Sequence, residues 1–221
     1  LIKKYLSADK NTEVIGKKVG CTNKTAQKQI NVKEPFYGNL FSHYSSKSGC
    51  SLNIDNFFRP FIEPEFSFKI KKDLDISNAP YSSIDIYNNI VSVLPSIEIV
   101  DSRFKDWTKA GINNLIADNA VNAYWIYGNE IKNLETFNFS NHPITLYINN
   151  QIVEKGNAKN VLGNPINSLT WLTNTLASQG KTLNSGSYVS TGTCTAATPV
   201  NKGDKICADF GNLGKIDLSF K

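Results

Sequence analysis

The sequence lacks several features that would assign it to a functional class at once. No apolar stretch approaches the roughly 18 residues that a membrane helix requires, so we expect no membrane partner. Its 24 basic residues outnumber its 19 acidic residues and give a net charge of +5, but no basic run stands out. Nucleic-acid binding is therefore not indicated, and a mildly basic solvated surface is expected instead.

Cysteine and methionine patterns are also missing. The four cysteines form no C-x-x-C pair and have no histidine close by in sequence, which argues against a zinc site and against a disulfide framework. We expect free thiols in a reducing compartment, and hence a cytoplasmic protein. Methionine is absent altogether. We therefore expect that the sequence lacks its native N-terminus, or that methionines of the natural protein are missing from it, in which case local spacings would shift by one.

The composition that remains is that of an ordinary globular domain. The 221 residues are 40% hydrophobic and 19% charged, which is enough to bury one sizeable core. Strand-like runs dominate the second half of the chain, and a few helices flank them. We predict an α+β fold, with a mixed, mainly antiparallel rolled or sandwich-like core, and a single domain over residues 1–221.

Local signals predict most elements of this core. Residues 13–23 contain a short strand, and Thr22 or Asn23 would cap the helix that follows. Residues 144–156 are typical of a hairpin, with the turn at the two asparagines in its middle. Asn164 would cap a helix that ends before Gly180. Three further strands are predicted over 186–193, 204–210 and 215–220.

A third helix is predicted over residues 81–94. Its apolar side chains recur at helical spacing, and Ser82 or Ser83 would cap its start. Pro95 would end it, and residues 96–100 would follow as a buried strand.

The stretch RPFIEPEFSF, residues 59–68, places two glutamates one residue apart in an otherwise apolar strand. Alternation puts Glu63 and Glu65 on one face and the neighbouring aromatic residues on the other. Their Cα atoms would lie about 6.6 Å apart, so both side chains could reach one cation at about 2.1 Å from each oxygen. Pro64 removes a ladder donor and predicts an edge position or a bulge. On spacing alone, two solvated surface glutamates remain the alternative.

A third carboxylate, Glu98, occurs in another strand-like apolar run. Ile97 and Ile99 flank it and should face the core. Three such carboxylates would repel one another unless a cation lay between them. Oxygen ligands suit Mg²⁺ or Mn²⁺ far better than zinc.

Lys18, in the run GKKVG, is the fourth polar candidate. It shares its strand face with Gly16 and Gly20, which would leave one side of the lysine open to an anionic ligand. A plain surface lysine is the alternative.

Six segments occur together in a recognisable order: GKKVGCTNKTAQKQINVKEPFYG, RPFIEPEFSF, VLPSIEIVDSRFKDW, ADNA, NPINSLTWLTNTLASQG, and STGT followed by VNKGDKICADFGNLGKIDLSF. In this order they resemble the fumarylacetoacetate hydrolase superfamily, and within it the 2-keto-4-pentenoate hydratase / 4-oxalocrotonate decarboxylase branch. The resemblance runs from about Glu13 to the C-terminus, and it implies further native residues before Leu1.

The resemblance implies a metal-dependent enzyme, a carbon–oxygen lyase of the hydratase type in the catabolism of aromatic compounds. Its substrate would be a small 2-oxo or 2-hydroxydienoate acid. It implies a homo-oligomer and a possible partner decarboxylase or hydratase. The implied metal ligands for Mg²⁺ or Mn²⁺ are Glu63, Glu65 and Glu98, the implied catalytic residue is Lys18, and the implied substrate-binding positions are Lys18, Phe36, Val121, Thr191 and Gly192.

Two positions depart from the pattern of the family. Phe36 stands where relatives carry the aspartate of Q-P-D-F-G, and Val121 stands where they carry the serine of D-N-A-S. Neither replacement can transfer a proton or activate water. The chain would then act on a more apolar substrate or need less proton relay, or be a weak or inactive relative. A local shift of the alignment would also explain the departures.

Other functions stay open at this point. A 4-oxalocrotonate-type decarboxylase is one, because hydration and decarboxylation pass through similar enolates. A non-enzymatic subunit that binds metal and ligand is another, and a plain binding protein with solvated carboxylates is a third. The acylpyruvate hydrolase branch is less well supported, since its Glu-His pair could use only His43 or His142.

Overall fold

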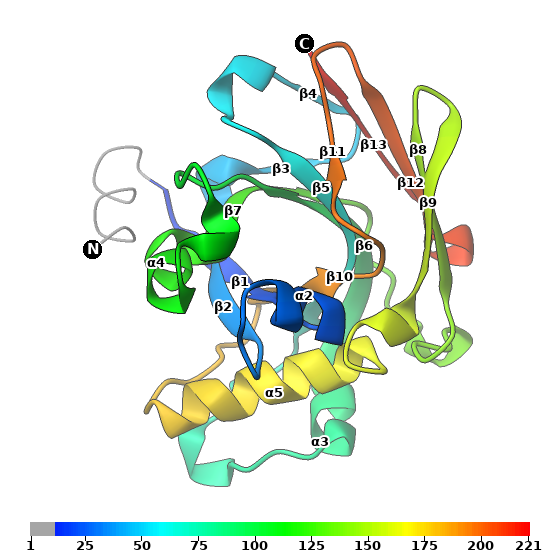
Figure 1. Ribbon diagram of the computed structural model, residues 1–221. Helices are drawn as coiled ribbons and strands as arrows, with labels where there is room; N and C mark the ends of the chain where they lie inside the picture. Colours follow the sequence, from blue (N-terminus) through cyan, green and yellow to red (C-terminus); the bar gives the residue numbers. More distant parts are fainter. Residues whose placement is uncertain (1–11) are drawn as a thin grey trace.

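The computed structural model describes residues 12–221, and the strands in this range form two sheets (Figure 1). The larger sheet contains, in spatial order, β2 (Phe36–Phe41), β1 (Val14–Gly20), β10 (Tyr188–Thr193), β5 (Phe61–Ile70), β6 (Ile90–Val100), β7 (Asn122–Tyr127) and β3 (Ser45–Lys47), with β11 (Thr198–Pro199) paired to β5. The smaller sheet contains β4 (Cys50–Leu52), β13 (Lys215–Phe220), β12 (Lys205–Asp209), β8 (Pro143–Ile148) and β9 (Gln151–Asn157). Pairing is antiparallel except for β1–β10, β3–β7 and β4–β13.

The helices in the described part of the chain are few and short. Its α-helices are α2 (Lys24–Gln29), α3 (Ser83–Asn88), α4 (Ile112–Ala117) and α5 (Pro165–Ser178). The single-turn segments are η1 (Ser42–Tyr44), η2 (Ile54–Asn56), η3 (Ile76–Asn78), η4 (Trp107–Lys109), η5 (Asn119–Val121), η6 (Leu134–Thr136), η7 (Ala158–Asn160) and η8 (Gly211–Leu213). None of the helices in residues 12–221 combines the length and the apolar character that a membrane crossing requires.

The larger sheet curls strongly, so that its strands surround a central region, and α5 runs along its outer side next to α3 (Figure 1). Asn164 caps α5 by accepting a hydrogen bond from the Ile166 N–H at 2.9 Å, and Pro165 takes the first helical position. The buried side of α5 carries Leu169, Leu172 and Leu176 at helical spacing. The predicted α+β fold with a rolled, mainly antiparallel core is confirmed.

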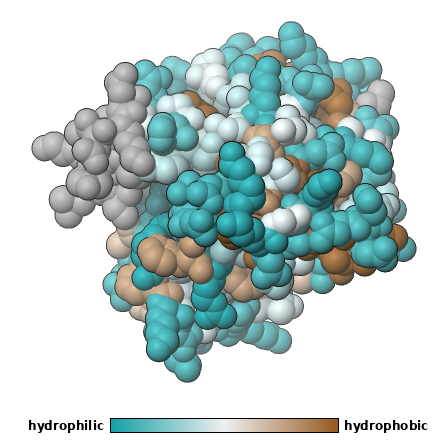
Figure 2. Space-filling model, turned by 90° about the horizontal axis from the view of Figure 1, so that it is seen from above, coloured by the Kyte–Doolittle hydropathy of each residue, from teal (hydrophilic) through white to brown (hydrophobic). Residues whose placement is uncertain are grey.

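The main apolar core lies on the outer face of the curled sheet. Phe66 and Phe68 of β5 and Ile97 and Ile99 of β6 are completely buried in it, together with side chains of α5 and the smaller sheet. The polar residues of β5 and β6 point to the inner face instead. The alternation predicted for these two strands is therefore confirmed. The surface seen from above is mostly hydrophilic, with smaller hydrophobic areas between (Figure 2).

The predicted hairpin is also confirmed. Asn149 and Asn150 have φ of 53° and 64°, as a two-residue turn of type I′ requires. The first strand, the helix capped by Asn23 and the three C-terminal strands lie where the sequence predicts them.

The helix predicted over 81–94 is wrong in its second half. Helix α3 begins after the Ser82 cap but ends at Asn88, and β6 begins at Ile90 and includes Pro95. The β-branched residues after Ile90 favour a strand, and pairing with β5 buries Val93 completely. Ile84, at the start of the helical pattern, is 71% exposed, and the residue of α3 that is buried is Ile86.

Pro64 is the second correction. It does not lie on an edge strand, because β5 is paired on both sides, with β10 and β6. The alternative prediction, a bulge, agrees with the structure: the register of β10 shifts between Ser190 and Thr193, opposite this part of β5. The irregular pairing accommodates a residue that has no N–H to donate.

Candidate metal centre

Three glutamates converge on the inner face of the curled sheet. Glu63 and Glu98 are directly opposite each other in the β5–β6 ladder, and Glu65 follows two residues further along β5. One carboxylate oxygen from each lies within 4.8 Å of the others. Glu65 and Glu98 are completely buried, whereas Glu63 is partly exposed. Strand alternation thus brings together the three carboxylates that the sequence singles out.

One oxygen of Glu65 is held firmly by β10. Its Oε2 accepts hydrogen bonds from the Ser190 hydroxyl at 2.5 Å and from the Gly192 N–H at 3.0 Å. The other oxygen, Oε1, is buried and has no hydrogen-bond partner among the described residues. The side chain is therefore oriented by one oxygen and bare at the other.

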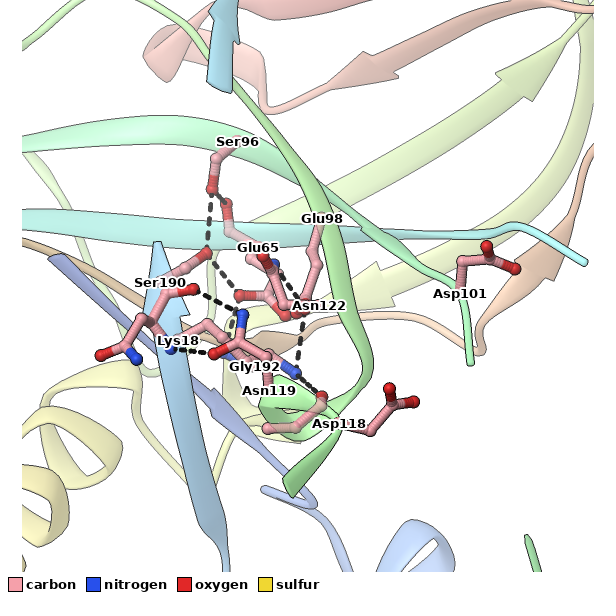
Figure 3. A network of polar contacts seen from close by, with 12 residues as sticks. Lys18, Glu65, Ser96, Glu98, Asp101, Asp118, Asn119, Asn122, Ser190 and Gly192 are labelled. Atoms are coloured by element: carbon pink, nitrogen blue, oxygen red, sulfur yellow. Dashed lines mark hydrogen bonds and ion pairs between the residues drawn. The ribbon is translucent and has the colours of Figure 1, made fainter. Parts of the chain in front are cut away.

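Glu98, on strand β6, likewise has one hydrogen-bonded and one bare carboxylate oxygen (Figure 3). Its Oε1 accepts hydrogen bonds from the Lys18 Nζ at 3.0 Å and from the Asn122 Nδ2 at 2.9 Å. Its Oε2 is buried and, within residues 12–221, makes no hydrogen bond. A bare buried carboxylate oxygen is costly, and two of them in one cluster point to a missing cationic partner.

Lys18 is almost completely buried, at 2% exposed. It projects from β1 and donates to Glu98 and to the Ala120 carbonyl, at 3.1 Å. With two acceptors among the described residues, one of its three N–H donors is left for a ligand. The openness that Gly16 predicts is wrong, because a Cβ there would lie 2.0 Å from the Tyr188 carbonyl oxygen. The neighbouring strand fills that space, and Gly16 permits the close approach.

A left-handed turn supplies the Ala120 carbonyl. Asn119, Ala120 and Val121 have φ of 55°, 54° and 57°, a conformation that costs about 1–3 kcal/mol per residue and persists only where the surroundings enforce it. The Asn119 side chain enforces it by accepting from and donating to the backbone of Asn39, at 2.8 and 2.9 Å. Gly38 leaves the room, since a Cβ there would lie 2.3 Å from the Asn119 carbonyl oxygen.

A group of buried serines lies beside Glu65 (Figure 3). The Ser67 hydroxyl is 2.8 Å from that of Ser96 and 3.1 Å from that of Ser190, and Ser96 also donates to the Glu65 carbonyl at 3.0 Å. Each serine comes from a different strand, β5, β6 or β10. The group ties these strands together directly behind the carboxylate.

The electrostatics of the cluster are those of crowded negative charge. Burial, followed by the charges of Glu98 and Glu63, raises the pKa of Glu65 well above its ordinary value. Burial and the charge of Glu98 raise the pKa of Glu63 to about 7. Burial alone would lower the pKa of Lys18, but the three carboxylates raise it above its ordinary value. The lysine is therefore a cation at neutral pH, and one lysine does not neutralise three glutamates.

The donor set fits a hard divalent cation. All three ligands offer carboxylate oxygens, which Mg²⁺ and Mn²⁺ prefer. Octahedral coordination at about 2.1 Å places neighbouring ligand oxygens about 3 Å apart and opposite ones about 4 Å apart. Oxygens already within 4.8 Å of one another would need only small side-chain rotations to reach this geometry. Glu63, Glu65 and Glu98 could therefore hold the ion, and the two bare oxygens would be satisfied by it.

The remaining predicted site residues lie around this cluster with different orientations. The Gly192 N–H contacts Glu65, as described, whereas the Thr191 hydroxyl donates to the Phe66 carbonyl at 2.8 Å and does not contact a glutamate. Phe36 and Val121 are buried beside the lysine, in a small apolar cluster of their own.

The histidines lie elsewhere. The His142 ring is hydrogen-bonded to the Phe210 carbonyl at 2.6 Å and packs against Phe66, which is on the outer face of β5. His43 is in η1, with its ring against Tyr44. The four cysteines are free, as predicted.

Sequence reasoning missed three groups that hold the site: the Ser190 hydroxyl, the Asn122 amide and the Ala120 carbonyl. Ser190 could have been found, because it precedes Gly192 by two residues and so shares its strand face. Nothing in the sequence signals the other two, since a left-handed turn presents the Ala120 carbonyl and the pairing of β7 with β6 places Asn122.

Comparison with known proteins places this arrangement in a family. Residues 15–220 match the family described as fumarylacetoacetate (FAA) hydrolase C-terminal. The chain belongs to this family. A solved structure of 4-oxalocrotonate decarboxylase from Pseudomonas putida G7, complexed with magnesium and adipate, superposes with a TM-score of 0.93 at 30% identity, covering 100% of this chain and 82% of that one.

Two curated relatives are hydratases. The 2-oxo-hept-4-ene-1,7-dioate hydratase of Escherichia coli is 32% identical over 93% of this chain and 78% of its own length. The 2-keto-4-pentenoate hydratase of Burkholderia vietnamiensis is 28% identical over 94% of this chain and 78% of its own length. The predicted family and its enzymatic character are thus confirmed, and its similar members are named for both hydration and decarboxylation.

Proposed function

We propose that this protein is a divalent-metal-dependent, hydratase-like lyase that acts on short 2-hydroxydienoate or 2-oxo acids. The observation that carries the proposal is the pair of bare, buried oxygens on Glu65 and Glu98, next to Glu63 and a buried ammonium group. The names of the similar hydratases support the reaction class.

The bound Mg²⁺ or Mn²⁺ would supply Lewis acidity toward the carboxylate and 2-oxygen of such an acid. The residues of the chain would do the rest. Glu65 is oriented by Ser190 and Gly192, so its free oxygen points into the site. Lys18 is positively charged and would donate its remaining N–H to the substrate carboxylate or to the oxygen on which negative charge develops. The burial of the cluster keeps water from screening these charges.

A decarboxylase is the second candidate. The solved structure with a TM-score of 0.93 belongs to a 4-oxalocrotonate decarboxylase, and the same cluster would stabilise the enolate of either reaction. An impaired enzyme that still binds metal and ligand is the third candidate, because Phe36 and Val121 cannot handle protons.

The test is the loss of dienol absorbance of 2-hydroxypenta-2,4-dienoate with Mg²⁺, with Mn²⁺ and with chelator. We expect metal-dependent turnover in the native chain, none in Glu65→Gln, and full activity in the control Glu135→Gln, whose carboxylate is exposed. Carbon dioxide release from 4-oxalocrotonate without hydration would favour the decarboxylase. Turnover that is equal in Glu65→Gln would refute the role of the cluster. Metal binding without any turnover would favour the impaired relative.

A further inference from the structure

Phe36 lies directly alongside the lysine of the site. In the antiparallel β1–β2 ladder, Gly20 is opposite Phe36 and Lys18 is opposite Gly38, so all four residues face the inner side. A Cβ placed on Gly20 would be 3.3 Å from the Lys18 Nζ and 3.4 Å from the Cζ of Phe36. The ring tip and the ammonium group therefore border the same small space.

Val121 is a second apolar residue close to the lysine. It directly follows Ala120, whose carbonyl binds the lysine, and it packs in one cluster with Phe36 and Val100. Val100 and Phe61 are opposite each other in the β5–β6 ladder, two residues beyond Glu63 and Glu98 on the same face. We refer to Phe36, Val121, Val100, Phe61 and Trp107, all in or against this cluster, as the apolar wall.

The wall continues into a cavity of about 200 Å³ that Phe61, Val100 and Trp107 help to line. This volume corresponds to roughly six water-sized groups at about 30 Å³ each, enough for a short hydrocarbon chain. Arg59 and Lys105 at the cavity are exposed. A hydrated surface cation attracts a carboxylate only weakly.

The charges at the cavity are also mixed. Asp106 lines it together with Arg59 and Lys105 and forms an ion pair with Lys109 at 2.9 Å. Apart from the uncharged Ser102 and Thr108, the other side chains that line the cavity are apolar, and none of its lining residues is a buried cation. A second carboxylate on a substrate would have to lose water against them without gaining a buried partner.

We propose that the apolar wall receives the distal end of the substrate and makes the protein selective for monocarboxylic 2-oxo or 2-hydroxydienoic acids with a hydrocarbon tail. This inference rests on the proposed function, since it assumes that the oxo-acid end binds at the glutamates and Lys18. Each methylene group buried against the wall should strengthen binding about fourfold. A terminal carboxylate of the same chain length should weaken it.

The test is calorimetric titration of pyruvate, 2-oxohexanoate and 2-oxoadipate into the full chain at saturating Mg²⁺. The last two acids have the same carbon number and differ in the terminal group. We expect 2-oxohexanoate to bind at least about tenfold more tightly than pyruvate and than 2-oxoadipate. Equal or tighter binding of 2-oxoadipate would overturn the proposal and indicate that Arg59 or Lys105 captures the second carboxylate.

Substitutions in the apolar wall, compared with the same substitution elsewhere, test whether the wall determines the preference between these acids. Val121→Thr keeps the shape and adds a hydroxyl, and should reduce the preference for 2-oxohexanoate several-fold without changing pyruvate binding. Val153→Thr makes the same change on β9, where the side chain is 39% exposed, and should change nothing. An unchanged preference in Val121→Thr and also in Phe36→Leu would contradict the role of the wall. If no 2-oxo acid binds in the presence of Mg²⁺, the proposed function itself fails.

Discussion

The two faces of the β5–β6 strand pair are equally buried but opposite in chemistry. On the outer face, Phe66 and Ile97 are 0% exposed within the apolar core. On the inner face, Glu65 and Glu98 are also 0% exposed, yet each has a carboxylate oxygen without a hydrogen-bond partner among residues 12–221. The same alternation of one strand pair thus produces both surfaces.

The outer face stabilises the fold, whereas the inner face holds the carboxylates of the site. Burial of the outer side chains removes apolar area from water and stabilises the folded state. Burial of the inner carboxylates costs free energy, because neither a single lysine nor the surrounding serines replaces the water they lose. The inner face is tolerated because the outer core is extensive, and we infer that a divalent cation offsets much of its cost.

A substitution on the outer face should have the largest effect on the free energy of unfolding. Phe66→Ala leaves a cavity in the core and should lower the free energy of unfolding by about 3–5 kcal/mol, measured by urea denaturation. The affinity of the still-folded protein for Mg²⁺ should remain within about threefold, since the side chain points away from the glutamates. A variant that keeps its stability but loses the metal would reverse the assignment of the two faces.

A substitution on the inner face should lower the affinity for Mg²⁺ and leave the stability of the metal-free protein intact. Glu65→Gln keeps the shape but removes one of three mutually repelling charges, so the metal-free protein should be at least as stable as the native chain. Its affinity for Mg²⁺ should fall by about 100-fold or more, because even outer partners of metal ligands contribute 10–100-fold. Calorimetry measures this affinity, with Glu135→Gln as the control. A clear loss of metal-free stability would show that Glu65 is a structural residue.

The pH should act on the two faces unequally. The pKa of Glu63 is raised to about 7 by burial and by Glu98, so between about pH 4.5 and 7 the folded, metal-free chain binds more protons than the unfolded chain. The free energy of unfolding should therefore fall as the pH rises through this window. Mg²⁺ binds the ionised carboxylates, so its affinity should rise roughly tenfold per pH unit up to about pH 7.

Urea denaturation and calorimetry between pH 5 and 8 check both slopes. Glu63→Gln should flatten them, whereas Phe66→Ala should lower stability equally at every pH. An Mg²⁺ affinity that does not change between pH 5 and 7 would contradict a raised pKa at the site.

The smallest effect on Mg²⁺ affinity is expected for a residue that orients a metal ligand without binding the metal itself. Ser190→Ala removes the 2.5 Å hydrogen bond that orients Glu65 and should weaken Mg²⁺ binding roughly tenfold. Ser83→Ala, at an exposed position in α3, is the matched control and should leave the affinity unchanged. A loss of stability in Ser190→Ala without any change in metal affinity would limit the serine to holding the sheet together.

The sequence was sufficient to predict which carboxylates lie on the inner face. Period-two alternation was enough to place Glu63 and Glu65 together, and the apolar neighbours of Glu98 indicated that it was buried. The helical pattern over 81–94 failed because periodicity alone does not show which stripe is buried, and pairing with β5 decided the structure of residues 90–94.

The groups that complete the site could not be predicted for a different reason. Ser190 is 125 residues from Glu65 in sequence, and Ala120 is 102 residues from Lys18. Asn122 reaches Glu98 because β7 pairs with β6, and it directly follows three consecutive residues in a left-handed conformation. That conformation depends on Asn119 and Gly38, and propensity gives no reason to expect it at Val121.

One measurement tests most directly whether the inner face is completed by a cation. The free energy of unfolding is determined at pH 8 with chelator and with saturating Mg²⁺, for the native chain and for Glu65→Gln. Mg²⁺ should stabilise the native chain by an amount that grows with its concentration and should leave the variant almost unchanged. Equal stabilisation of both proteins, or of neither, would contradict a metal centre at Glu63, Glu65 and Glu98.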